Sequence, residues 1–469
     1  MKTKKLPYLV YDFKITSNFL PNGLNQECTS TIMEENGHLN DAVMSSYYEN
    51  YIQIPNVNED LNIHDGLYKK ILIHDYEKLN IDTDDVFLYP IEPYANLNHF
   101  LGSVHTYSKK PSLEYISNKA LKELQNPNNN FYLIVSYPNE GTLFEHCFDY
   151  LYVIAERYKI PRKKIIFIIA CADLDDLHAQ YIEEKGIDKN DTIKTFYWTW
   201  SLRQKVAEAD KIKKGQEMYN IDGSVSTIVV EKDLDENIKR NKKFMMFNRR
   251  MRSHRVVLTS LFGKDFIDRN LISYDYNHLG DDPVLELFRE RVVEKYCQLG
   301  VDNMKQLIKE KPVSKVDYEN PFNTIGFGCE YKEPYLDSYI HIISETNFET
   351  PGMYFSEKTW KPILNFQPFI SVNYQYSLKY LKELGFKTFH PFIDESYDNE
   401  EDPIKRMTMI YEEVKRLDSL SIEEIHEWYY SIKDILIHNN TNAYKYQGKY
   451  QIDIEQKYLN KIVDYVKSS

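Results

Sequence analysis

Short apolar runs alternate, between residues 131 and 200, with longer segments in which apolar residues recur every three or four positions. The short runs are typical of strands buried on both faces, and the longer segments have the period of amphipathic helices. The pattern predicts strands at 131–137, 165–170 and 195–200, with helices at 143–158 and 174–184. Strands that alternate with helices indicate βαβ units and a parallel sheet.

A second series of the same kind opens near residue 240. The pattern predicts three strands and three helices, at 243–247, 254–262, 339–344, 357–366, 368–373 and 377–384. Residues 205–240 are rich in charge without a long apolar period, so we interpret them as an interdomain connection. Residues 402–468 have a helical pattern almost throughout.

The chain has 469 residues, which is too long for one ordinary core. We therefore expect an α/β protein with two Rossmann-like domains and C-terminal helices. The expected divisions are residues 1–235, 240–440 and a last helix over 441–469. The first 125 residues are the least informative, with short strand candidates such as 85–89.

Composition and charge narrow the class of protein to which the chain could belong. No apolar run approaches 18 residues and the N-terminus lacks a signal-peptide core, so we expect no membrane span and a cytoplasmic location. Five dispersed cysteines without a Cys-x-x-Cys pair fit a reducing compartment, and favour neither a disulfide framework nor a zinc site. A net charge of −13 argues against a general nucleic-acid binder, although a local basic groove stays compatible with it.

Residues 354–370 contain the most informative segment, which begins Tyr-Phe-Ser-Glu-Lys-Thr-Trp-Lys. Glu357 and Lys358 stand where a loop is predicted to enter a helix, between two predicted strands. Loops at the carboxyl ends of parallel strands are where open α/β sheets bind ligands. Free backbone N–H groups and the helix dipole favour negative charge at a helix start, so we expect a phosphate-bearing ligand near Lys358.

A basic segment over residues 242–255 is a second candidate for binding phosphate at a helix start. Six of its fourteen residues are Lys or Arg, in an otherwise acidic protein, and it runs from a predicted strand into a helix. Arg249 and Arg255 would be forked donors suited to the oxygens of a diphosphate. The alternative is a solvated basic face.

Together the two segments resemble glycosyltransferase family 10, the α-1,3-fucosyltransferases. Lys243-Phe244 through Arg255 is similar to the "KF…F…S/N…R" start of that family's donor domain. Ile343-Ser344-Glu345-Thr346 followed by Tyr354-Phe355-Ser356-Glu357-Lys358 is similar to its "ENS…YVTEK" signature. The resemblance covers about residues 240–395, and the fuller string looks closer still to glycosyltransferase-like proteins of phages and giant viruses.

The resemblance implies the GT-B architecture, in which two Rossmann-like domains face a cleft, and a nucleotide-diphosphate sugar as co-substrate without another cofactor. It implies that Arg255 and Lys358 hold the diphosphate and that Glu357 binds ribose or sugar hydroxyls. Glu345 would face the sugar or brace the loop, and Tyr354 would line the base or sugar. Glu345-Thr346 replaces the family's Glu-Asn, and the following loop carries Pro351-Gly352, so GDP-fucose is only the nearest analogue of the donor.

Transfer also requires a carboxylate that deprotonates the acceptor hydroxyl. We predict Glu140, in the turn after the 131–137 strand, with Glu145, His146 and Asp173 as rivals. The alternative for Glu140 is a capping role, because acidic residues favour the first turn of a helix. We expect no metal ion, since the basic residues can neutralise the leaving diphosphate.

Three other features have plainer interpretations. Trp198 and Trp200 face one side of a strand, which favours core packing over a sugar platform. His341 lies inside a strand and is interpreted as a core histidine. The acidic stretch 394–398 lacks the spacing of a calcium loop and is interpreted as solvated.

The sequence therefore predicts an inverting, metal-independent glycosyltransferase that acts on a hydroxyl acceptor, such as a glycan. One alternative is a viral enzyme that glycosylates modified bases in DNA, which would need a basic groove on the first domain. A second alternative is a non-catalytic binding or structural protein with a nucleotide-sugar fold.

Overall fold

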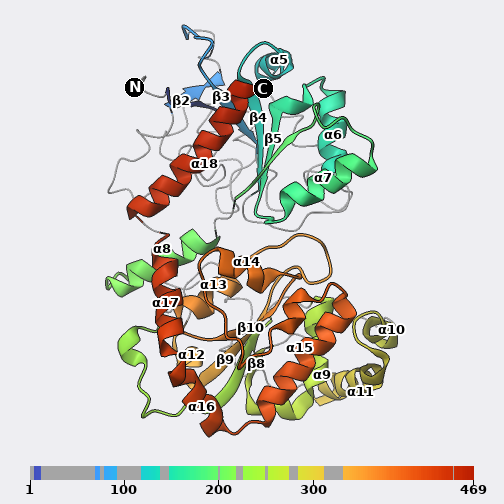
Figure 1. Ribbon diagram of the computed structural model, residues 1–469, viewed down its shortest axis with the longest axis vertical. Coiled ribbons are helices and arrows are strands. Elements are labelled where there is room, and N and C mark those ends of the chain that lie inside the picture. Colours follow the sequence, from blue (N-terminus) through green and yellow to red (C-terminus); the bar gives the residue numbers. More distant parts are fainter. Residues whose placement is uncertain are drawn as a thin grey trace, which may run out of the picture. The chain divides into compact units, whose positions relative to one another are not determined.

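The computed structural model describes residues 5–11, 69–73, 76, 79–91, 118–137, 147–198, 201–217, 225–248, 252–273, 284–310, 331–446 and 448–469. The chain divides into two compact units (Figure 1). The first unit contains Met1–Trp200 together with Gly448–Ser469, and the second contains Ser201–Gln447. Each unit is built around a parallel sheet, which confirms the α/β class and two parallel α/β units.

The described strands of the first unit form a six-stranded sheet in the order β2-β1-β3-β4-β5-β6, and every pairing in it is parallel. They are β1 (Tyr8–Tyr11), β2 (Lys69–Leu72), β3 (Phe87–Ile91), β4 (Phe131–Tyr137), β5 (Ile165–Ile169) and β6 (Lys194–Tyr197). All five side chains of β5 are buried, as a continuous run of apolar residues predicts for a strand covered on both faces.

Four described helices belong to this unit: α5 (Asn118–Gln125), α6 (Cys147–Arg157), α7 (Leu174–Glu184) and α18 (Gly448–Ser468). The strand register explains which face each one covers. Tyr132 of β4 and Phe196 of β6 point to one face, where their rings lie 6.1 and 6.4 Å from Tyr465 of α18. Phe167 of β5 points to the other face and contacts Phe148 of α6. Figure 1 shows α18 on one side of β4 and β5, with α6 and α7 on the other.

The second unit has a four-stranded parallel sheet in the order β10-β9-β7-β8. Its described strands are β7 (Lys242–Phe247), β8 (Leu271–Ser273), β9 (Ser338–Ser344) and β10 (Phe369–Val372). Its described helices are α8 (Ser201–Lys213), α9 (Ser253–Arg269), α10 (Val284–Arg289), α11 (Glu294–Glu310), α12 (Glu333–Asp337), α13 (Glu357–Leu364), α14 (Ser377–Glu383), α15 (Pro403–Ser419), α16 (Ile422–Ser431) and α17 (Lys433–Tyr444).

Both boundaries of the second unit differ from the expected ones: it begins at Ser201 and ends at Gln447. Residues 201–213, expected within or beside a connection, form α8 and belong to the second unit because Leu202, Val206 and Ala209 are buried at helical spacing. The last helix belongs to the first unit, where Leu459 and Ile462 join its hydrophobic core. The predicted divisions at 235 and 441 therefore do not coincide with the two compact units.

The acidic stretch 394–398 is not the solvated loop that we expected. Glu395 and Asp398 are buried, and their carboxylates accept backbone hydrogen bonds: Asp398 from Leu378 and Lys379 at the start of α14, and Glu395 from Phe389. Buried carboxylates need such donors, and adjacent chain segments supply them.

Two aromatic features take part in packing, as we expected: Trp198 is partly buried against the core of the first unit, and His341 is buried in the second. Trp198 stacks on Tyr458 of α18, with ring centroids 4.4 Å apart. His341 is buried and lies edge-on to Phe247 and Tyr335. Trp200 lies outside the described residues.

Replacing Ile462 with Ala tests where the last helix packs. The side chain is 2% exposed within the first unit's core, so its truncation should lower the free energy of unfolding by about 2–5 kcal/mol. Hydrogen exchange should accelerate in β4 and β5 and stay unchanged in β7 and β9. Exposed Lys461→Ala is the matched control on the same helix. Faster exchange confined to β7 and β9 would contradict the assignment of α18.

Candidate functional site

The strand order of the second unit identifies the edge of the sheet where a ligand is most favoured. β7 is the first described strand of the unit. The second, β8, lies on one side of it, and the third and fourth, β9 and β10, lie on the other, so the strand order reverses at β7. This is the doubly wound order, and ligands bind beyond the carboxyl ends of the strands at the point where the order reverses. Here that point lies between the ends of β7 and β9, where Asn248, Ser344 and Glu345 are found.

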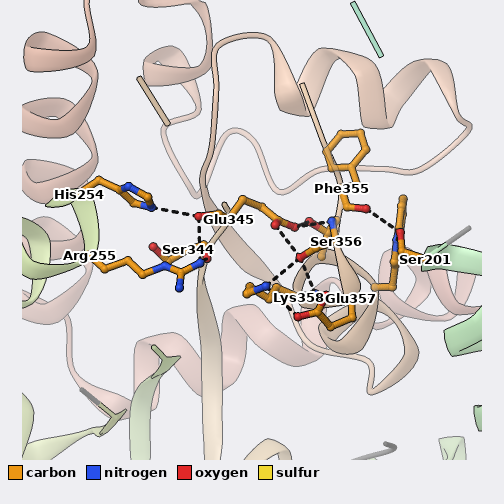
Figure 2. A network of polar contacts seen from close by, with 11 residues as sticks. Ser201, His254, Arg255, Ser344, Glu345, Phe355, Ser356, Glu357 and Lys358 are labelled. Carbon is orange, nitrogen blue, oxygen red and sulfur yellow. Dashed lines mark hydrogen bonds and ion pairs between the residues drawn. The ribbon is translucent and has the colours of Figure 1, made fainter. Parts of the chain in front are cut away.

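Glu345 is the most connected residue at this edge, and its side chain is 0% exposed. One carboxylate oxygen accepts hydrogen bonds from the Ser356 backbone N–H at 2.9 Å and from the Thr359 hydroxyl at 2.7 Å. The other accepts from the Ser356 hydroxyl at 2.6 Å. Figure 2 shows the carboxylate directed at the Ser356 segment and the backbone carbonyl turned to the opposite side. The side chain therefore joins the end of β9 to the start of α13.

The carbonyl group of Glu345 is held by two residues from the first turn of α9. His254 Nε2 lies 3.0 Å from this oxygen, and Arg255 Nη2 lies 3.1 Å from it and 2.8 Å from the carbonyl oxygen of Ser344 (Figure 2). A carbonyl oxygen only accepts, so His254 must carry a proton on Nε2. Burial lowers the pKa of His254 well below its usual value, and the neighbouring Arg255 lowers it further, so the ring is neutral at pH 7.

Ser356 begins α13 as its N-cap, because its hydroxyl accepts a hydrogen bond from the Lys358 backbone N–H at 3.2 Å. The Lys358 ammonium group lies 3.1 Å from the same hydroxyl and 2.7 Å from Glu357 Oε1. Burial alone would raise the pKa of Glu357, but Lys358 and Lys361 outweigh it and hold this pKa at about 2. Glu357 is thus ionised at neutral pH.

Lys358 and Glu357 are also the accessible members of the network. Their side chains are 26% and 24% exposed, whereas Glu345, Ser356 and Arg255 are each 3% exposed or less. An ammonium group has three N–H donors, and among the described residues two of them are used within the segment itself. A ligand at this edge can therefore reach Lys358 and Glu357 directly, while the residues beneath hold them in place.

Two buried polar atoms at the point of reversal have no hydrogen-bond partner among the described residues. They are Asn248 Oδ1 and Ser344 Oγ, and both residues are 2% exposed. The register that pairs Met245 with His341 also places Asn248 level with Ser344 across β7 and β9. An unsatisfied buried polar group costs about 1–3 kcal/mol, so a partner for these two atoms, such as an ordered water or a ligand, would be favourable.

The loop after β9 is supported by residues that the sequence patterns did not single out. Phe348 stacks on the His254 ring at 5.5 Å, and its carbonyl oxygen accepts a 2.5 Å hydrogen bond from buried Arg406 of α15. Asn347 Nδ2 donates to the Gly352 carbonyl oxygen at 2.7 Å. Each of these partners is distant in sequence from the motif or uses a backbone group, so no local pattern indicates it.

The predicted residues fall into three groups. Glu345, Arg255, Glu357 and Lys358 are brought together, with Glu345 placed as a brace and Arg255 on backbone carbonyls. Tyr354 lies next to them, is 7% exposed, and its carbonyl oxygen accepts from Asn373 Nδ2 at 3.3 Å. Four predicted residues, Glu140, Glu145, His146 and Arg249, lie outside the described residues.

Asp173, one of the rivals predicted as the base, lies in the first unit. It is the N-cap residue of α7, and its Oδ1 accepts a hydrogen bond from Cys171 Sγ at 3.1 Å. With Asp175 it forms an Asp-x-Asp sequence just after β5, although Asp175 is bonded to Thr195. Within the described ranges, no three His, Cys, Asp or Glu residues cluster as metal ligands would. No described helix has the length and apolar character to cross a membrane.

Searches of family models, of curated proteins and of solved structures find no match to this chain. The resemblance to glycosyltransferase family 10 therefore stays a prediction that rests on the motifs. The strand order and the hydrogen-bond network around Glu345 indicate where a ligand could bind, but not which family the chain belongs to.

Replacing Glu345 with Gln tests its bracing role. The amide keeps the shape but offers one acceptor oxygen where the structure supplies three donors, so the free energy of unfolding should fall by about 1–3 kcal/mol. Urea denaturation of the variant gives this quantity. Exposed Glu383→Gln removes a negative charge without a buried network and should change the stability by less than about 0.5 kcal/mol. Equal stability of the Glu345 variant and the native chain would contradict the bracing role.

Proposed function

We propose that this chain is an inverting glycosyltransferase of GT-B architecture that takes its sugar from a nucleotide-diphosphate donor. The observation that carries the proposal is the ion pair Glu357–Lys358, about a quarter exposed at the start of α13 beside the reversal point of a doubly wound sheet. The geometry favours a phosphate-bearing ligand, and the resemblance to glycosyltransferase family 10 suggests that this ligand is a sugar nucleotide.

The chemistry of transfer explains why such a pair would be useful. Negative charge develops on the diphosphate as the glycosidic bond breaks, and preorganised cations and helix N-termini stabilise it without reorganisation. Lys358 sits in the first turn of α13 with its ammonium group held by Ser356 and Glu357. Glu357 remains ionised at neutral pH and can accept hydrogen bonds from ribose or sugar hydroxyls. Arg255 would act from beneath by fixing the Glu345 carbonyl.

The acceptor and the base belong, in this proposal, to the first unit. A carboxylate there would deprotonate the acceptor hydroxyl, with Glu140 as the proposed base. A modified base in DNA is an alternative acceptor to a glycan, and salt-sensitive binding of duplex DNA would distinguish it. A non-catalytic protein of this fold would bind nucleotide sugars without turning them over.

Lys358→Ala tests the donor site. The change should abolish detectable sugar transfer or donor hydrolysis and should weaken binding of the nucleotide diphosphate at least tenfold, because it removes the ammonium group at the helix start. A thermal-shift screen of nucleotide sugars identifies the donor first, since a ligand that binds the native state raises the apparent stability. The exposed Lys415→Ala on α15 is the control. Native turnover in the Lys358 variant would exclude this site.

Glu140→Gln tests the assignment of the base. If Glu140 removes the acceptor proton, kcat should fall about 10²–10⁴-fold while the affinity for the donor stays unchanged. Glu145→Gln provides the matched comparison in the same segment. Donor affinity is measured by calorimetry and kcat with the donor found in the screen. An unaltered kcat in the Glu140 variant would remove it as the base and leave the donor site unaffected.

A further inference from the structure

The chain passes from the first unit to the second within a very short segment. Trp198 belongs to the first unit, where its backbone N–H donates to the Ile169 carbonyl oxygen at 3.1 Å and its ring stacks on Tyr458. Ser201 is the first residue of the second unit and of α8. Ser201 therefore stands at the point where the chain enters the second unit.

Ser201 makes two hydrogen bonds to the segment that carries the candidate site. Its hydroxyl donates to the Phe355 carbonyl oxygen at 2.6 Å and accepts from Trp360 Nε1 at 2.8 Å. Glu357 and Lys358 lie between these two contacts. Figure 2 shows Ser201 against Phe355 on one side of the Ser356 turn, with Glu345 on the other. The segment is therefore held from two sides, by the end of β9 and by the start of α8.

α17, the last helix of the second unit before the chain returns to the first, is bonded to the other end of the same helix. Asn440 of α17 is 5% exposed, and its Nδ2 donates to the Leu364 carbonyl oxygen at 2.9 Å, at the end of α13. Lys213 at the end of α8 donates to Asn440 Oδ1 at 3.3 Å and lies 3.7 Å from the ring centroid of Tyr444. The chain then continues from α17 into α18 of the first unit.

We propose that Ser201 is a positioning residue that fixes the segment of Glu357 and Lys358 to the point where the chain enters the second unit. Ligand binding at Lys358 and the position of the start of α8 are thereby linked, because the two hydrogen bonds of one hydroxyl join them. The link is reciprocal: whatever holds Ser201 favours the ligand-binding geometry, and the ligand orders the start of α8. The identity of the ligand rests on the proposed function, and the positional role does not.

Hydrogen exchange in the absence of ligand tests the positional role. Ser201→Ala should accelerate exchange of the amides in 354–360, and Ser201→Thr, which keeps a hydroxyl, should restore the native rates. Ser431→Ala is the matched control, because its hydroxyl also donates to a backbone carbonyl at 2.6 Å but lies on α16. Trp360→Phe keeps an aromatic ring and removes one of the two bonds, so it replaces Ser201→Ala if circular dichroism shows that variant to be unfolded. Native exchange rates over 354–360 in the hydroxyl-free variant overturn the proposal.

Calorimetric titration with GDP as the probe tests the link to the site. The affinity for GDP should fall about fivefold in Ser201→Ala, recover in Ser201→Thr and stay native in Ser431→Ala. GDP should slow exchange over 201–213 in the native chain and have less effect in Ser201→Ala. Equal GDP affinity of the native chain and Ser201→Ala overturns the proposal. If the native chain binds neither GDP nor any other nucleotide diphosphate, the proposed function fails, and the exchange over 354–360 alone decides the positional role.

Discussion

The carboxylate of Glu345 has no contact with solvent, and this constraint organises the edge of the second sheet. A buried carboxylate must be surrounded by hydrogen-bond donors, because leaving one without them costs several kcal/mol. The three donors come from Ser356 and Thr359, so the turn at the start of α13 can adopt few other positions. Once that turn is fixed, the backbone N–H groups of the helix start and the side chains of Glu357 and Lys358 are fixed with it.

The same residue connects this turn to α9. Its carbonyl oxygen receives hydrogen bonds from His254 and Arg255, and its own N–H donates to Val372 at the end of β10. The strand order places these groups together, because β7 and β9 are adjacent although about ninety residues separate them in the chain. The candidate site at the reversal point is thus assembled from the ends of three strands, and the ion pair Glu357–Lys358 is its exposed part.

Local patterns were sufficient for elements whose partners are close in sequence. Residues 131–137 and 174–184 form the strand and helix that the apolar periodicity predicts. The misjudged segments depend on distant partners: α8 looked like a connection because its apolar face is narrow, and α18 packs against strands more than 250 residues away. The motif likewise drew attention to Glu345 and Lys358. Tertiary packing, which the motif does not show, decides that Glu345 is a buried brace and Lys358 an accessible cation.

The contacts of α13 limit how strongly the candidate site and the two helices that hold it, α8 and α17, can influence each other. Ser201 contributes two hydrogen bonds at the start of this helix and Asn440 contributes one at its end, each worth about 1 kcal/mol net. Hydrogen bonds of this strength support coupling of about 1–3 kcal/mol, which corresponds to a change of roughly 5–150-fold in affinity. Because α13 is short and is bonded at its start to α8 and at its end to α17, a displacement of either helix would act on the helix that carries Lys358. The energy of the link therefore resides in the contacts of one helix and needs no longer pathway through the unit.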